Sequence, residues 1–136
     1  MTLHNTLGIF AAAAIAISGS IAVADPATSE HFDLGESRIT LHLHDFLTDE
    51  ELAVLRLVGQ NEEALALFLP EGAGGFGALA VAPADGFIRD GMPAESAVAL
   101  SELPDMDGAK AAAVAQCNTL RSGGRACEVV LEIAPR

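Results

Sequence analysis

Two histidines separated by one residue are the clearest source of chemistry in the sequence. They are His42 and His44, and Asp45 follows directly. On a strand, both imidazoles share one face at a separation that can chelate a metal ion, with Asp45 close by. In this hypothesis His31 or the carboxylates of residues 49–51 complete the set of ligands. A polar strand face that happens to carry two histidines explains the same pattern, because the sequence fixes no third ligand.

The cysteines, Cys117 and Cys127, are two in number and lie ten positions apart. This spacing is too wide for a Cys-x-x-Cys redox motif, and a structural zinc site needs about four ligands. In an oxidising compartment such a pair most simply forms one disulfide. Two free, buried thiols are the alternative.

Other chemistries have weak support. Residues 70–75, Pro-Glu-Gly-Ala-Gly-Gly, are rich in glycine, but no Gly-Lys-Ser/Thr follows them to bind a phosphate. The serines lie in no nucleophile-elbow motif. The sequence therefore predicts no catalytic residue, and no cofactor other than a divalent metal at the histidine pair.

The charge of the chain narrows the class of partner. Nineteen acidic and seven basic residues give a formal net charge of −12. Binding to nucleic acid or to anionic lipid needs clustered Lys and Arg, so neither partner is expected. The acidity itself is explained most simply by solubility.

The first 24 residues have the layout of a secretory signal peptide. An apolar core occupies residues 7–17, and Ala22-Val23-Ala24 supplies small residues before Asp25. The segment before the core departs from the usual pattern because it has no Lys or Arg. The core is also far shorter than the roughly 20 residues that span a bilayer. We therefore expect export to the periplasm or the medium, cleavage after Ala24 and no membrane attachment afterwards.

The remaining chain has the size of one small domain. Residues 25–36 are polar and show no period, which predicts a mobile lead-in, and residues 37–136 then form the domain. Apolar and polar residues alternate over 37–45, which predicts a strand carrying both histidines on its polar side.

A capping box predicts the first helix. Thr48 is the N-cap and Glu51, three residues later, can reach back to its amide. The helix is expected to end at Gly59, with Arg56 placed to pair with the acidic first turn.

The other apolar patterns predict, in chain order, a short helix or a buried strand with the helix favoured, a hairpin or meander, a strand, an alanine-rich helix and a last strand. These segments are residues 61–69, 76–88, 96–102, 108–121 and 127–134. In the last strand Leu131 is expected to face the core and Val130 the solvent. The predicted fold is α+β, with a small antiparallel sheet of three to four strands packed against two or three helices, and one disulfide.

Four motifs follow one another in the C-terminal half: a run of small residues, a Pro-x-x-Gly turn, the end of the alanine-rich helix and the start of the last strand. They are residues 77–81, Pro83 with Gly86, Ala115-Gln116-Cys117, and Cys127-Glu128-Val129-Val130. In this order they resemble a domain family of unknown function from small exported bacterial proteins, especially alphaproteobacterial ones. The resemblance covers residues 77–133. It implies an exported α+β domain with one helix-to-strand disulfide, and it brings no activity.

Proteins that resemble this one are sometimes labelled 5-aminolevulinate synthase. That reaction uses pyridoxal phosphate on a Schiff-base lysine inside a large pocket. Lys110 is the only lysine, and it falls in the first turn of the predicted alanine-rich helix. We therefore expect a non-catalytic binding or accessory module for an envelope protein or a small ligand. The alternative is a metal-binding protein or enzyme that uses His42 and His44.

Overall fold

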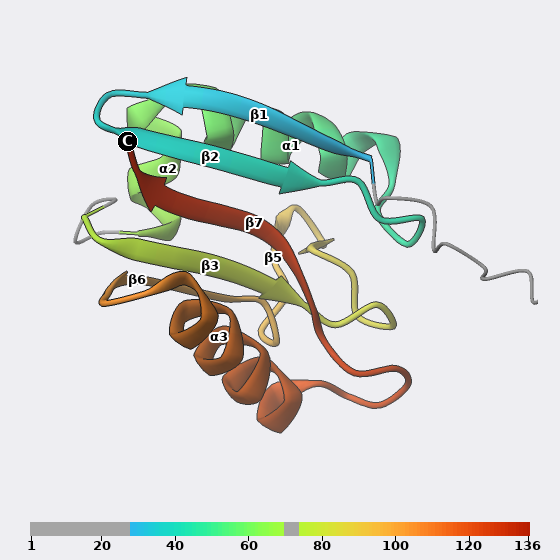
Figure 1. Cartoon of the computed structure of the whole chain (residues 1–136). Coiled ribbons are helices and arrows are strands. Elements are labelled where there is room, and N and C mark those ends of the chain that lie inside the picture. Colours follow the sequence, from blue (N-terminus) through green and yellow to red (C-terminus); the bar gives the residue numbers. More distant parts are fainter. Residues whose placement is uncertain (1–27, 70–73) are drawn as a thin grey trace, which may run out of the picture.

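A five-stranded antiparallel sheet forms the centre of the fold (Figure 1). The computed structural model describes residues 28–69 and 74–136. The strands are β1 (Ser29–Leu34), β2 (Ser37–His42), β3 (Phe76–Val81), β6 (Val98–Leu103) and β7 (Glu128–Pro135). They lie in the order β1-β2-β7-β3-β6, and all neighbouring pairs are antiparallel. The predicted α+β class is confirmed, but the sheet is larger than the expected three to four strands.

Helices cover both faces of the sheet. α1 (Asp49–Gln60) and α2 (Glu62–Phe68) lie on one face, and α3 (Met106–Leu120) lies on the other (Figure 1). The segment 61–69, which the pattern left open between helix and strand, contains α2. Asp105 is the N-cap of α3, and its side chain accepts a hydrogen bond from the Gly108 amide.

The alternation of side-chain size along β3 separates the two cores. Leu79 and Val81 belong to the core under α1 and α2, whereas Ala78 and Ala80 belong to the core under α3. Successive strand residues point to opposite faces, so one strand serves both layers. Because Ala78 and Ala80 are small, the alanine-rich α3 can approach β3 closely.

The chain between β3 and β6 forms a separate two-stranded hairpin, β4 (Ile88–Arg89) and β5 (Met92–Pro93). The predicted hairpin or meander over 76–88 is therefore wrong in its pairing. β3 instead lies between β7 and β6 in the sheet, and both of these strands come from parts of the sequence that are distant from β3.

The prediction of a mobile lead-in over residues 25–36 is wrong for residues 29–34, which form β1. This strand pairs with β2 along its whole length, and the two are joined by a turn at Gly35. Phe32 on β1 packs against α1, where a Cβ on Gly59 would lie only 2.8 Å from its ring. The sequence of β1 looks polar because only one face of the strand packs against the rest of the protein, so its pattern did not predict a strand. The predicted signal peptide (residues 1–24), the first part of the predicted lead-in (residues 25–27) and residues 70–73 lie outside the described residues.

The capping box of α1 is confirmed. The Glu51 amide donates to Thr48 Oγ1 at 3.1 Å, and the Thr48 amide donates to Glu51 Oε1 at 3.1 Å. The helix continues through Gly59 to Gln60. The direct partner of Arg56 was not predicted: its guanidinium makes a bidentate pair with Glu30 of β1, at 2.8 to 3.1 Å, while Asp49 of the first turn adds only an electrostatic attraction.

A β-bulge alters the orientation of side chains in β7. Leu79 pairs with Leu131, but Ala80 pairs with Val129, so Val130 is an extra residue. Val130 is consequently fully buried in the core under α1, although strict alternation predicted that it faces solvent.

Candidate functional site

The histidine pair lies at the end of β2, on the face of the sheet away from α1. His42 is the last residue of the strand and His44 lies just beyond it, with the two ring centroids 6.2 Å apart. The imidazole Nε2 of His42 is 3.0 Å from Oε2 of Glu132, and Lys110 Nζ is 3.1 Å from the other oxygen of that carboxyl. Burial raises the pKa of Glu132, but hydrogen bonds from His42 and Lys110 outweigh it and hold the pKa below its usual value.

Both Nε2 atoms of this pair act as hydrogen donors. Glu132 is a carboxylate at neutral pH, so His42 Nε2 donates to it. His44 Nε2 is 2.8 Å from the Val129 carbonyl oxygen, which can only accept, and its Nδ1 lies 3.5 Å from Glu128. A metal ion needs the lone pair of a neutral ring nitrogen, so the pair must exchange these contacts before its Nε2 atoms can bind one.

The other predicted ligands form no metal-binding group with the pair in the described ranges. His31 on β1 contacts Thr40 Oγ1 at 3.1 Å, Asp45 is exposed, and Glu51 is buried within the capping box. In residues 28–69 and 74–136, no group of three or more His, Cys, Asp or Glu side chains is arranged to hold a metal ion. The structure thus brings His42 and His44 together, but within the described ranges it adds no third predicted ligand to a metal-binding arrangement.

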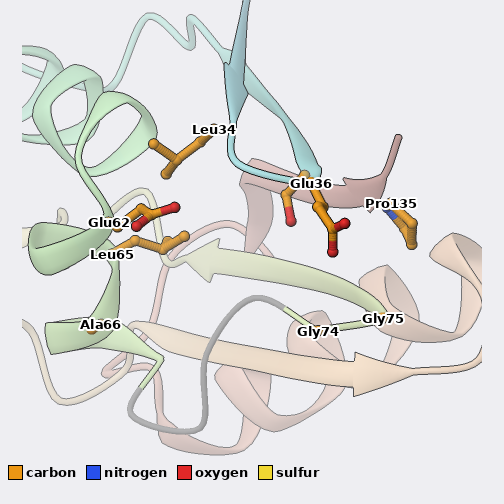
Figure 2. A pocket seen from close by; sticks show the side chains of 9 residues that line it. Leu34, Glu36, Glu62, Leu65, Ala66, Gly74, Gly75 and Pro135 are labelled. Carbon is orange, nitrogen blue, oxygen red and sulfur yellow. The ribbon is translucent and has the colours of Figure 1, made fainter.

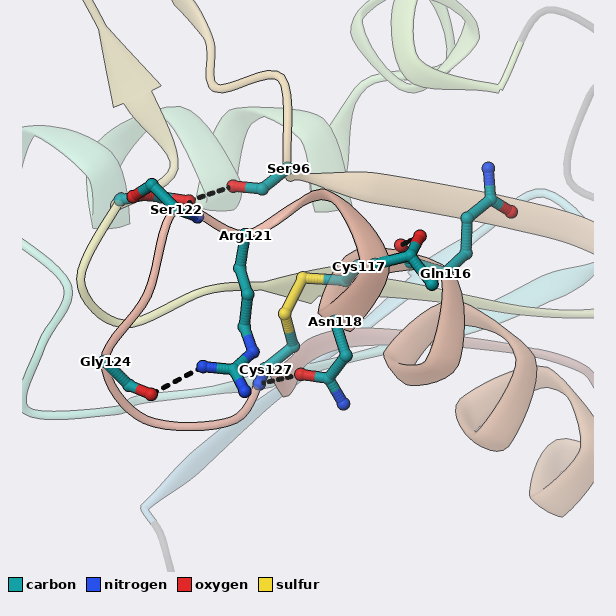
Figure 3. The surroundings of a disulfide bond; sticks show 10 residues. Ser96, Gln116, Cys117, Asn118, Arg121, Ser122, Gly124 and Cys127 are labelled. Carbon is teal, nitrogen blue, oxygen red and sulfur yellow. Dashed lines mark hydrogen bonds between the residues drawn. A yellow bond between two sulfur atoms is a disulfide. The ribbon is translucent and has the colours of Figure 1, made fainter.

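The predicted disulfide is confirmed between Cys117, at the end of α3, and Cys127, directly before β7 (Figure 3). Both cysteines are buried. The loop that they close is held from within: Asn118 Oδ1 accepts from the Cys127 amide at 2.8 Å, and Arg121 donates to the Gly124 carbonyl at 2.5 Å. This covalent closure fixes the loop that begins at the end of α3.

A polar cluster that the sequence analysis missed lies beside this loop. Asp85, in the turn after β3, accepts hydrogen bonds from Ser96 Oγ at 2.7 Å, from the Ser122 amide at 3.1 Å and from the Ser122 hydroxyl. Its side chain is only 6% exposed. The hydrogen bonds from Ser122 and Ser96 place the pKa of Asp85 below its usual value. Figure 3 shows Ser122 on the disulfide loop and Ser96 on a neighbouring segment.

A pocket of about 500 Å³ opens over this cluster, and we call it the Asp85 pocket. The β4–β5 hairpin and the end of α3 form its walls. Met92 is 69% exposed and Leu120 is 50% exposed, and both line the pocket. They are two of the four large apolar side chains that are exposed in the described part of the chain. Its lining residues are Asp85, Arg89, Asp90, Met92, Pro93, Ala94, Glu95, Ser96, Leu120 and Ser122.

One wall of the Asp85 pocket is fixed from α1. Glu51 Oε2 accepts from the Ile88 amide at 2.9 Å and from the Phe87 amide. Burial raises the pKa of Glu51, but the hydrogen bonds from the backbone and Thr48 outweigh it, so the pKa is lowered. The same carboxylate therefore caps α1 and holds the segment that leads into β4.

Comparison with known protein families, with curated proteins and with solved structures found no match. The resemblance over residues 77–133 therefore stays an inference from its motifs. None of the helices in the described ranges combines the length and apolar character that crossing a bilayer requires.

Proposed function

We propose that this chain is an exported, non-catalytic binding module, and that the Asp85 pocket is where it holds its partner. The observation that carries the proposal is the convergence of Met92 and Leu120 over a polar floor made by Asp85 and Ser96. Binding sites in proteins are typically concave, with apolar walls and a few fixed polar groups. Exposed apolar side chains gathered at one place are typical of an interaction site.

The hydrogen bonds of the polar floor favour binding over catalysis. Ser96 and Ser122 both donate their hydroxyl hydrogens to Asp85. A serine nucleophile needs a base that removes this proton. The lowered pKa of Asp85 makes it a weak base, so neither hydroxyl is activated.

The charges at the rim indicate the chemistry of the partner. Asp90 and Glu95 line the Asp85 pocket. Among the described residues, Arg89 is the only basic residue that lines it. Arg89 is already 3.8 Å from Asp85. An apolar anchor with basic flanks fits this rim, such as a peptide segment of an envelope protein.

The disulfide supports the exported location. Disulfides persist in oxidising compartments and are rare in the cytosol. The Cys117–Cys127 bond thus agrees with the predicted signal peptide, and we propose a periplasmic or secreted protein.

The experiment compares two matched double variants in cross-linking to envelope proteins of the exporting cell. Met92→Ser with Leu120→Ser removes the apolar walls of the pocket, whereas Leu57→Ser with Leu67→Ser removes exposed leucines elsewhere. We expect the first variant to lose a cross-linked partner that the wild type and the control variant both retain. Identical cross-linking by all three proteins, with unchanged thermal unfolding, contradicts the proposal.

The histidine pair offers the alternative function. His42 and His44 lie 6.2 Å apart between ring centroids, and a metal ion that bound both of their Nε2 atoms would displace Glu132 and the Val129 carbonyl. The metal-binding alternative therefore predicts that zinc binding is pH-dependent and requires both rings.

A further inference from the structure

A second pocket lies between the β1–β2 turn, α2 and the chain that enters β3 (Figure 2). Its volume is about 400 Å³, which is within the range of small-molecule sites. Leu34, Leu65, Ala66 and Pro135 contribute apolar surface to it. None of these residues lines the Asp85 pocket, so the two pockets are separate.

Two carboxylates stand over this apolar surface. Glu36 comes from the β1–β2 turn and Glu62 comes from the first turn of α2, and Figure 2 shows them approaching the pocket from different elements. Neither carboxylate has a hydrogen bond or an ion pair to any other described side chain.

The backbone places Glu62 close to the turn. Gly35 adopts a φ of 58°, and a Cβ at this position would lie 2.9 Å from Oε1 of Glu62. The glycine therefore leaves the space into which the carboxylate folds. A larger residue at this position would have to displace the Glu62 carboxylate.

The basic residue next to the pocket is already engaged. Arg136 follows Pro135, but its guanidinium contacts the Gly35 carbonyl at 3.4 Å and Asp33 at 3.8 Å. No basic residue is among the described residues that line the pocket. The described lining of the pocket therefore carries two acidic side chains, Glu36 and Glu62, and no basic one.

We propose that this pocket binds a small organic cation, an alkyl diamine. Its methylene groups would cover Leu34 and Leu65, and its ammonium groups would pair with Glu36 and Glu62. The complementarity is of two kinds, since the apolar surface selects a hydrocarbon body and the unpaired carboxylates select positive charge. The proposal is independent of the function assigned to the Asp85 pocket.

The test is a titration of the purified protein with 1,5-diaminopentane, followed by amide NMR in 150 mM NaCl. We expect saturable shifts at the amides of Gly35, Glu36, Gly74 and Gly75. Glu36→Gln with Glu62→Gln is expected to weaken the affinity at least ten-fold. The matched control, Glu50→Gln with Glu63→Gln, removes the same charge from exposed positions outside the pocket.

Three outcomes overturn the proposal. The first is an equal loss of affinity in both double variants, because that indicates general attraction to an acidic chain. The second is an equal response to magnesium chloride at the same ionic strength, because a bare cation gains nothing from the apolar surface. The third is a set of shifts that does not saturate or that is spread over the whole surface.

Discussion

Replacing Glu51 by Ala tests whether one carboxylate holds two parts of the fold together. Glu51 is 5% exposed, and its oxygens accept hydrogen bonds from three backbone amides: Thr48, Phe87 and Ile88. The variant removes the carboxylate, so all three amides lose their hydrogen-bond acceptor. The N-cap of α1 and the approach to β4 are therefore weakened by the same substitution.

The expected cost follows from these three contacts. A buried donor that loses its partner costs about 1 to 3 kcal/mol; only Phe87 of the three donor residues is buried and the contacts are not independent, so we expect a total of about 3 to 5 kcal/mol. At roughly 4 °C per kcal/mol for a domain of this size, the melting temperature falls by about 12 to 20 °C. Glu51→Gln keeps one acceptor oxygen and is expected to lie between the wild type and Glu51→Ala.

Glu50→Ala is the matched control. Glu50 is exposed in the same helical turn, and losing its interaction with the helix dipole costs about 0.3 to 1 kcal/mol. Thermal and urea unfolding followed by circular dichroism give the free energies. If Glu51→Ala unfolds within about 2 °C of Glu50→Ala, which on the same scale is under about 1 kcal/mol, the carboxylate does not hold the β4 segment.

The pH dependence gives a second test of Glu51. Its pKa is lowered in the folded state, so its stabilising contribution is complete above the unfolded pKa of about 4.3 and is lost as the pH falls through the folded pKa. The stability difference between the wild type and Glu51→Gln should therefore shrink as the solution is acidified below about pH 4. A difference that stays constant or grows in acid contradicts the assignment.

Four further predictions concern the disulfide, the signal peptide, the histidine pair and Asp85. Replacing Cys117 by Ala should lower the free energy of unfolding by about 2 to 3 kcal/mol and the melting temperature by about 10 °C. If an alkylating reagent modifies two thiols of the wild-type protein without reductant, the bond is absent. Export should remove residues 1–24, which intact mass of the envelope protein checks. Zinc binding in calorimetry, if present, should vanish in His42→Ala with His44→Ala, and binding that survives refutes that site. Asp85→Asn should lower the free energy of unfolding by about 1 to 3 kcal/mol, measured by urea denaturation.

The elements that the sequence predicts well are specified by neighbouring residues. The capping box needs only Thr48 and Glu51, three positions apart, and α3 needs only its N-cap and a run of alanines. The pairing of Cys117 with Cys127 is equally local, because a helix, a short loop and a strand bring their ends together. Each of these predictions relies on contacts within about ten residues.

The features that the sequence did not reveal depend on partners that are far apart. β1 looks polar because its charged residues find partners elsewhere, as Glu30 does on α1. Val130 is buried by a bulge whose cause lies in the register with β3, which no pattern within β7 can indicate. The pairing of β3 with β7 is likewise a contact between distant segments. Periodicity reports which faces a segment has, but it does not report what covers them.

Asp85 shows the same limit at the candidate site. Its sequence context, Pro83-Ala84-Asp85-Gly86, is sufficiently explained as a turn. Its partners Ser96 and Ser122 are 11 and 37 residues away, so no local motif marks it. Asp85→Asn should nevertheless destabilise the protein, because the amide nitrogen cannot accept a hydrogen: the serine hydroxyl that faces it must turn to become the acceptor, and the charge-assisted hydrogen bonds of the carboxylate are lost. An unchanged free energy of unfolding would mean that the three residues are merely neighbours, and the pocket would lose its fixed polar floor.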